Sequence, residues 1–263
     1  MDENRTITED IDGPIATVTL SRAEQHNAFN PDMVNALTES FGQLGRNKDV
    51  RVIILTGSGR SFCAGADLNS MKAAAENTYE DNLADAEAIF DLMTSINYCP
   101  HPVVGRINGA AIGGGVGLVG CCDITVAVDR ARFGLSEARL GLVPAVISPF
   151  VIAKIGSSNA RELFLTGERF DAIRAKEIGL VNHVVGEPQL DERIREIVLE
   201  LMQSAPGAVT AAKQLIAMVT GRSDADLRTY TTKLIAKRRS SLEGREGISA
   251  FLEKREPWWR DHQ

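Results

Sequence analysis

The sequence predicts a mixed α/β protein with an all-helical C-terminal part. Short aliphatic runs of strand length recur up to about residue 190, and amphipathic stretches of helical length alternate with them. Beyond Leu190 only helical spacing remains. We therefore expect a core that holds the active site over residues 1–195 and a helical region for oligomerisation over residues 196–263.

The first half of the chain alternates strand and helix signals. Asn30 precedes Pro31 and Asp32, and an N-cap residue followed by a first-turn proline and an acid predicts a helix that runs to about Leu44. Asp81–Asn97 has apolar residues every three to four positions and predicts a second helix. The strands expected around these helices are Thr6–Ile11, Ile15–Leu20, Val50–Leu55, Val103–Ile107 and Ile124–Val128.

The second half is mostly helical in pattern. Asp171 is an N-cap candidate for a helix that ends at Gly179, and Val181–Val185 is the last expected strand. We expect the helical tail to pack against a neighbouring subunit. The other helical stretches are Ile147–Ile155, Asn159–Leu165, Leu190–Gln203, Ala208–Val219, Ala225–Leu242 and Gly247–Arg255.

Composition excludes several classes of protein. The 263 residues are 44% hydrophobic and carry a net charge of −6, which argues against a broad nucleic-acid surface. No apolar run is long enough to span a bilayer, and the acidic start, Met1–Asn4, has no secretory pattern. The four cysteines form no C-x-x-C pair, so we expect no metal site and a reducing, cytoplasmic setting.

The most distinctive stretch is the glycine-rich run Gly109–Gly117, which leads into the apolar segment Val116–Cys122, where we expect a helix. Glycines at a helix N-terminus leave N–H groups free, and these favour an anion or an oxygen that becomes anionic during a reaction. The structural alternative is a tight turn that allows close helix packing. Gly115–Gly120 also fits G-x-G-x-x-G, but the expected strand ends at Ile107, too far upstream for a dinucleotide site.

Glu137 is a lone acid in the mostly apolar stretch Arg132–Pro144. Burial would raise its pKa towards acid–base use near neutral pH. The alternative is a salt bridge to Arg132 or Arg139. His26 lies in a polar loop after a strand and is a candidate ligand contact.

Five spaced stretches together resemble the crotonase (enoyl-CoA hydratase/isomerase) superfamily: Ser61–Asp67 (SFCAGAD), Asn108–Gly117 (NGAAIGGGVG), Asp123–Ile124 (DI), Phe133–Glu137 (FGLSE) and Ala250–Arg255 (AFLEKR). The resemblance implies a spiral of ββα units and a C-terminal helical trimerisation region, with trimers paired as hexamers. It also implies an acyl-CoA thioester as the ligand, with coenzyme A as part of the substrate and no separate cofactor.

The resemblance further implies site residues. The backbone N–H groups of Ala64 and Gly114 would form an oxyanion hole, and Glu137 would be the acid–base group. Fixed donors there stabilise an enolate-like state more than the ground state. The implied substrate contacts are Gln25, His26, Ala64, Gly65, Ala66, Asp67, Gly114, Gly117, Phe251 and Lys254.

Gly117 departs from the family pattern. Family hydratases hold two glutamates around the reacting water, and the position of one of them is Gly117 here. We hypothesise that the space left at Gly117 admits a bulkier or carboxylated substrate. Arg139–Pro149 and Glu24–Phe29 resemble the branch of methylglutaconyl-CoA and isohexenylglutaconyl-CoA hydratases.

The sequence therefore predicts a lyase that adds water to a branched, glutaconyl-type 2-enoyl-CoA. Three alternatives remain open at this point: an enoyl-CoA isomerase that uses Glu137 without water, a catalytically idle acyl-CoA binder, and a nicotinamide oxidoreductase that uses the glycine run.

Overall fold

The computed structural model describes residues 5–220 and 224–260, so the acidic start Met1–Asn4 lies outside it. The larger of its two sheets has six strands in the order β1-β2-β3-β5-β7-β10. Only the hairpin pair β1 and β2 is antiparallel, and the other neighbours are parallel. The strands are β1 Ile7–Asp12, β2 Ile15–Leu20, β3 Val52–Gly57, β5 Val103–Ile107, β7 Ile124–Val128 and β10 His183–Val185.

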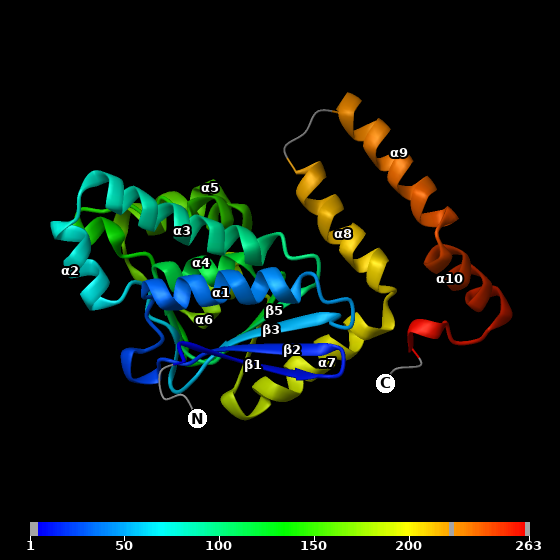
Figure 1. Cartoon of the computed structure of the whole chain (residues 1–263), viewed down its shortest axis with the longest axis horizontal. Helices are drawn as coiled ribbons and strands as arrows, with labels where there is room; N and C mark the ends of the chain where they lie inside the picture. Colours follow the sequence, from blue (N-terminus) through cyan, green and yellow to red (C-terminus); the bar gives the residue numbers. More distant parts are fainter. Residues whose placement is uncertain (1–4, 221–223, 261–263) are drawn as a thin grey trace.

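Helices cover both faces of this sheet, which is why its inner strands are continuous aliphatic runs. Figure 1 shows α1 (Pro31–Leu44) and α3 (Tyr79–Asn97) on one side and α7 (Leu190–Gln203) on the other. The predicted caps are confirmed, since the Asn30 side chain accepts from the N–H of Met33 at 3.0 Å. Asp171 caps α6 (Ala172–Glu177) in the same way.

The smaller sheet has four strands of three residues each, in the order β4-β6-β8-β9. Its strands are β4 Ser61–Cys63, β6 Ala110–Ile112, β8 Arg132–Gly134 and β9 Arg169–Asp171. The sequence patterns predicted none of them. Since β4, β6 and β8 are parallel, the segments that follow these three strands all emerge at one edge of the sheet.

Two helices follow the strands of the smaller sheet directly. The glycine-rich run becomes β6 and then α4 (Gly114–Cys121), and α2 (Leu68–Glu76) follows the loop after β4. Ser148–Thr166 forms α5, which is interrupted at Gly156 with φ +72°, where the sequence patterns separate two helices.

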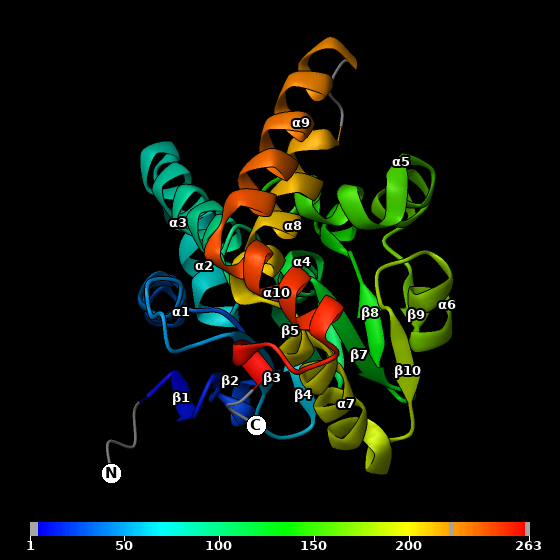
Figure 2. The same ribbon diagram turned by 90° about the vertical axis from the view of Figure 1, so that its right-hand side faces the viewer.

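The C-terminal helices stand apart from the two sheets. Figures 1 and 2 show α8 (Pro206–Val219), α9 (Asp224–Ser240) and α10 (Leu242–Glu253) extending from one end of the core. The predicted division at residue 195 falls inside α7, which packs on β5 and β7. The chain end returns to the core, where the indole of Trp259 donates to the carbonyl of Gln203 at 3.1 Å.

Large apolar side chains are exposed along these C-terminal helices, as a subunit contact would require. They include Ile216, Ile235, Ile248, Phe251 and Leu252. No helix in the described part of the chain combines the length and the hydropathy needed to cross a membrane.

Candidate active site

A cavity of about 620 Å³ opens where β4, β6 and β8 end. It brings together most of the residues that the sequence singled out, although they come from four separate segments. The predicted site residues that line it are Gln25, His26, Ala64, Gly65, Ala66, Asp67, Gly114 and Glu137. Side chains of α2 and of the segment after Glu137, among them Leu68, Met71 and Leu142, complete its walls.

A smaller cavity of about 140 Å³ adjoins the first. Its walls are apolar and come from Phe29, from Ile89 on α3 and from Val143–Ile147. The two cavities share Ala66, Gly114 and Glu137 in their linings. These three residues therefore lie at the junction between the larger cavity and the smaller one, which we call the apolar chamber.

Ala64 is not an oxyanion-hole donor, in contrast to the sequence-based expectation. Its N–H already donates to the carbonyl of His26 at 3.0 Å. The N–H of Phe29 donates to Gly65 at 2.6 Å, and the N–H of Asp67 donates to Phe29 at 2.8 Å.

The free donor of this segment is Ala66. It lies between Gly65 and Asp67, which both bond to Phe29 in a parallel bridge, so its own N–H points away from Phe29. That N–H has no acceptor among residues 5–220 and 224–260. Ala66, and not Ala64, thus has the N–H group of this motif that is free to bind a ligand.

Gly114 supplies the second donor. It is the first residue of α4, and N–H groups in a first helical turn have no intrahelical partner. The two donor segments lie side by side, because a Cβ built on Gly65 would be 3.4 Å from the amide nitrogen of Gly114. A Cβ on Gly114 itself would lie 2.6 Å from Cε2 of Phe29, so only glycine fits there.

Glu137 faces the same helix start. A Cβ on Gly113 would lie 3.1 Å from Oε1 of Glu137, and Gly113 has φ +53°, so this position needs glycine on both grounds. Oε2 is buried without a hydrogen-bond partner in the described chain, and burial raises the pKa of the carboxyl group. The expected alternative, a salt bridge to Arg132 or Arg139, is wrong, because both guanidinium groups donate to backbone carbonyls.

Gly117 does not provide the room that we expected. It is buried inside α4, and a Cβ there would lie 2.4 Å from Cγ2 and 2.9 Å from Cβ of Ile147. Ile147 thus fills the space beside Gly117 and presents an apolar wall to the smaller cavity. The same burial shows that Gly115–Gly120 is helix interior and not a phosphate-binding loop.

Asp67 has its carboxylate fully engaged. Oδ2 accepts from the guanidinium of Arg22 at 2.9 Å, and Oδ1 accepts from the N–H of Asn69 at 2.8 Å in the first turn of α2. Burial alone would raise the pKa of Asp67, but these hydrogen bonds and the charge of Arg22 lower it below its ordinary value. The carboxylate therefore holds the loop and α2 in place.

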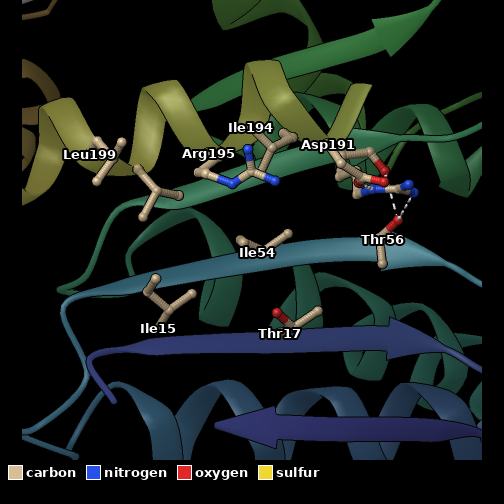
Figure 3. Close-up of a pocket in the computed structure, with 10 residues that line it drawn as sticks. Ile15, Thr17, Ile54, Thr56, Asp191, Ile194, Arg195 and Leu199 are labelled. Atoms are coloured by element: carbon tan, nitrogen blue, oxygen red, sulfur yellow. Dashed lines mark hydrogen bonds and ion pairs between the residues drawn. The ribbon is translucent and has the colours of Figure 1, made fainter. Parts of the chain in front are cut away.

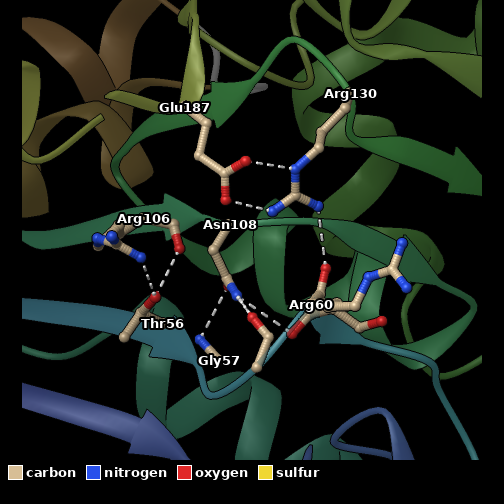
Figure 4. A network of polar contacts seen from close by, with 9 residues as sticks. Thr56, Gly57, Arg60, Arg106, Asn108, Arg130 and Glu187 are labelled. Carbon is tan, nitrogen blue, oxygen red and sulfur yellow. Dashed lines mark hydrogen bonds and ion pairs between the residues drawn. The ribbon is translucent and has the colours of Figure 1, made fainter. Parts of the chain in front are cut away.

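The loop before β4 is held by an amide and an ion pair that sequence reasoning missed (Figure 4). The Asn108 side chain accepts from the N–H of Gly57 at 3.2 Å and donates to the carbonyl of Gly59 at 3.0 Å. Arg130 pairs with Glu187 at 2.7 Å and donates to the carbonyl of Arg60 at 3.2 Å. An asparagine directly after a buried strand is the signal that could have indicated this role.

Two predicted contacts are remote from the cavity within one chain. Phe251 and Lys254 are exposed at the end of α10, and neither lines the cavity in the part of the chain that is described. A further hollow of about 360 Å³ lies between the larger sheet and α7 (Figure 3). Its carboxylate, Asp191, is paired with Arg106 at 2.6 Å, so it offers no free acid–base group.

Comparison with known proteins identifies the family. Residues 10–262 match the model of the enoyl-CoA hydratase/isomerase family. A "putative enoyl-CoA hydratase" of Thermus thermophilus is 32% identical over 245 residues, which cover 93% of this chain and 97% of that protein.

Solved structures agree with this comparison. An enoyl-CoA hydratase from Shewanella pealeana superposes with a TM-score of 0.94 at 37% identity, covering 98% of this chain and 97% of that one. The structure of AtuE from Pseudomonas aeruginosa superposes with a TM-score of 0.95 at 32% identity, covering 98% and 100%. The chain belongs to the enoyl-CoA hydratase/isomerase family and has the fold of crotonases.

Proposed function

We propose that this chain is an enoyl-CoA hydratase-type lyase that adds water reversibly to a 2-enoyl-CoA thioester. One observation carries the proposal. Two free backbone N–H groups, of Ala66 and Gly114, and the half-buried carboxylate of Glu137 meet at the junction of the larger cavity and the apolar chamber. Relatives that carry the name enoyl-CoA hydratase support the reaction class.

The two N–H groups bind the thioester oxygen. When water adds to C3 of the acyl group, the π electrons of the C2=C3 bond move towards the thioester, and negative charge builds on its oxygen. Fixed donors stabilise that charge without having to reorganise, and the loss of one such donor costs about 10²–10³ in kcat. The acyl chain then occupies the chamber between Phe29 and Ile147.

Glu137 moves the proton. Its carboxylate takes one proton from water as the water oxygen bonds to C3, and the resulting carboxylic acid gives that proton to C2 of the enolate. The raised pKa suits both halves of this exchange, because the group must accept and release a proton near neutral pH. Electrons and protons balance without a cofactor.

An enoyl-CoA isomerase is the second candidate, and Gly117 and Ile147 favour it. An apolar side chain lies where family hydratases have a second glutamate, so Glu137 is the one carboxylate among the described residues that lines both cavities. An isomerase needs only one group that removes and returns a proton. Mass spectrometry distinguishes the two reactions, since only hydration increases the product mass by one water.

The predicted glutaconyl-type substrate is the finer part of the proposal. A glutaconyl chain has a second carboxylate, whereas the described residues that line the apolar chamber include Glu137 and neither lysine nor arginine. We therefore propose that an uncharged, branched acyl group is preferred and keep 3-methylglutaconyl-CoA as the rival. Higher kcat/KM on 3-methylglutaconyl-CoA than on 3-methylcrotonyl-CoA would reverse this preference.

We also propose self-association as a trimer or a hexamer through α8–α10. The exposed apolar side chains on these helices support it, and Phe251 and Lys254 would then reach the cavity of a neighbouring subunit. Light scattering after size exclusion should give the mass of three or six chains. A monomer at micromolar concentration would refute the assembly and the contacts of both residues.

The decisive experiment is an activity screen of the purified protein. Crotonyl-, 3-methylcrotonyl- and 3-methylglutaconyl-CoA are offered, the loss of the enoyl thioester absorbance is followed, and products are identified by mass. Glu137→Gln is the matched variant. If it binds acyl-CoA as the wild type does and both turn over nothing, the chain is an idle acyl-CoA binder and the proposal fails.

A further inference from the structure

We propose that Arg22 and Asp67 form a positioning pair that aims the N–H of Ala66 at the thioester oxygen. The inference rests on the proposed function, because it concerns the donor that stabilises the enolate. Arg22 lines neither of the two cavities at the site, so it acts through the segment that it holds.

One guanidinium group joins the two segments that orient Ala66. Nη1 of Arg22 donates to the carbonyl of Ala28 at 2.5 Å, and Nη2 donates to Oδ2 of Asp67 at 2.9 Å. Ala28 directly precedes Phe29, and Asp67 directly follows Ala66. We call Arg22 with its bonds to Ala28 and Asp67 the clamp. The clamp encloses the bridge between Phe29 and Ala66, whose two hydrogen bonds turn the Ala66 N–H towards the cavity.

The base of the clamp is rigid. The backbone N–H of Arg22 donates to the Asn27 side chain at 3.0 Å, and the N–H of Asn27 donates back to the carbonyl of Arg22 at 2.8 Å. Asn27 is completely buried with φ +56°, and its amide donates to the carbonyls of Ser58 and Phe62 at 2.9 and 3.2 Å. Arg22 thus transmits the position of this fixed loop to the donor segment.

The Arg22–Asp67 pair also connects the segment that carries Ala66 to α2. The second oxygen of Asp67 caps α2 at the N–H groups of Asn69 and Ser70, and α2 has no buried residue of its own. Without Arg22, the buried charge of Asp67 would lose its counter-ion and Oδ2 its hydrogen-bond donor, and the loop would have to shift to hydrate that oxygen. A shift of about 1 Å is enough to misplace a catalytic donor.

Three variants test the pair. Arg22→Gln removes the charge and the two-pronged contact, Arg22→Lys keeps the charge but cannot make both bonds with a planar fork, and Asp67→Asn removes the partner. Arg174→Gln is the matched control, because Arg174 on α6 makes an exposed ion pair with Glu162 on α5 at 3.0 Å. Circular dichroism and thermal melts establish that each variant is folded.

We expect Arg22→Gln and Asp67→Asn to lower kcat about 10–100-fold with KM changed less than about threefold, since a misaimed donor loses part of the 10²–10³ that it contributes. The variant that combines Arg22→Gln and Asp67→Asn should lose less kcat than the product of the two single losses, because both changes break the same pair. Arg22→Lys, the milder change, should fall between wild type and Arg22→Gln, and Arg174→Gln should match wild type.

The independent readout is the ¹³C shift of the thioester carbonyl in bound butyryl-CoA, which cannot react. It should move towards the free-solution value in Arg22→Gln and in Arg22→Lys. Unchanged kcat and an unchanged carbonyl shift in a folded Arg22→Lys or Arg22→Gln variant would overturn the inference. A wild-type protein that changes the ¹³C shift of the thioester carbonyl but turns over no enoyl-CoA would refute the proposed function. The positioning role of Arg22 would then be tested by the ¹³C shift in the variants alone.

Discussion

The packing of Gly117 against Ile147 leads to a prediction with a definite sign. Gly117→Ala should gain up to about 1 kcal/mol of helix propensity in α4. Against this, its Cβ would lie 2.4 Å from Cγ2 and 2.9 Å from Cβ of Ile147, both shorter than ordinary contact at about 3.5–4.0 Å. Such overpacking costs about 1–3 kcal/mol, so even with the full propensity gain we expect the variant to be less stable, by up to about 2 kcal/mol.

The cost of Gly117→Ala should decrease when Ile147 is shortened. Ile147→Ala alone leaves a hole and should cost about 2–5 kcal/mol, because Ile147 is 4% exposed. Adding Gly117→Ala to it removes the clash with Cγ2, keeps the helix propensity and refills part of the hole, while the 2.9 Å approach to Cβ of residue 147 remains. In that background the alanine at 117 should therefore destabilise the protein less than it does in wild type.

Thermal melts of the four proteins measure this coupling. For a chain of this size about 1 kcal/mol corresponds to about 2–4 °C, so Gly117→Ala should lower the melting temperature by up to about 8 °C in wild type and by less in Ile147→Ala. All melts use one protein concentration, because subunit association changes the apparent stability. Equal effects of Gly117→Ala in the two backgrounds would show that Ile147 does not occupy the space beside Gly117.

Three further predictions concern the junction of the cavities. Glu137→Gln should lower kcat about 10²–10⁴-fold with acyl-CoA affinity retained in calorimetry. Burial raises the folded-state pKa of Glu137 above its ordinary 4.5, so ionisation of this group opposes folding as pH rises through that pKa. Glu137→Gln should therefore melt at a higher temperature than wild type at about pH 8 and not at about pH 4. Gly114→Ala should lower kcat about 10–100-fold, because its Cβ would lie 2.6 Å from the Phe29 ring and displace the donor; steady-state rates at wild-type level would contradict this. In amide exchange followed by NMR, the N–H of Ala64 should be protected in the free protein, whereas that of Ala66 should become protected only with butyryl-CoA bound.

The elements with strong local patterns could be predicted from the sequence. The helix over Leu190–Gln203 and the strands over Ile15–Leu20, Val103–Ile107 and Ile124–Val128 have the predicted bounds, because periodicity and caps lie within each segment. The strands β4, β6, β8 and β9 were missed for the opposite reason. Each has only three residues and exists through pairing with a strand far away in the sequence, and no local pattern reports such pairing.

The packing at Gly117 also depends on a contact between segments far apart in the sequence, and so it could not be predicted from the local pattern. The sequence shows that a carboxylate is absent from this position, which is a local fact. It cannot show that Ile147, thirty positions later, turns its side chain into the space that remains. A missing side chain predicts a cavity only when nothing else fills it, and protein interiors are packed too densely to leave such a volume open without a reason.

The exchange of Ala64 for Ala66 shows how a correct motif can yield a wrong donor. Every residue of Ala64–Asp67 carries an N–H, and the motif alone does not say which of them is unpaired. Two carbonyl groups of the segment around Phe29 decide which N–H groups are occupied. The carbonyl of Phe29 accepts from the N–H of Asp67, and the carbonyl of His26 accepts from the N–H of Ala64. In an extended segment bonded on one side, the N–H that remains for a ligand is the one between the bonded positions. The chemistry of this site is therefore set by a parallel bridge between two loops, and Arg22 holds that bridge on both sides.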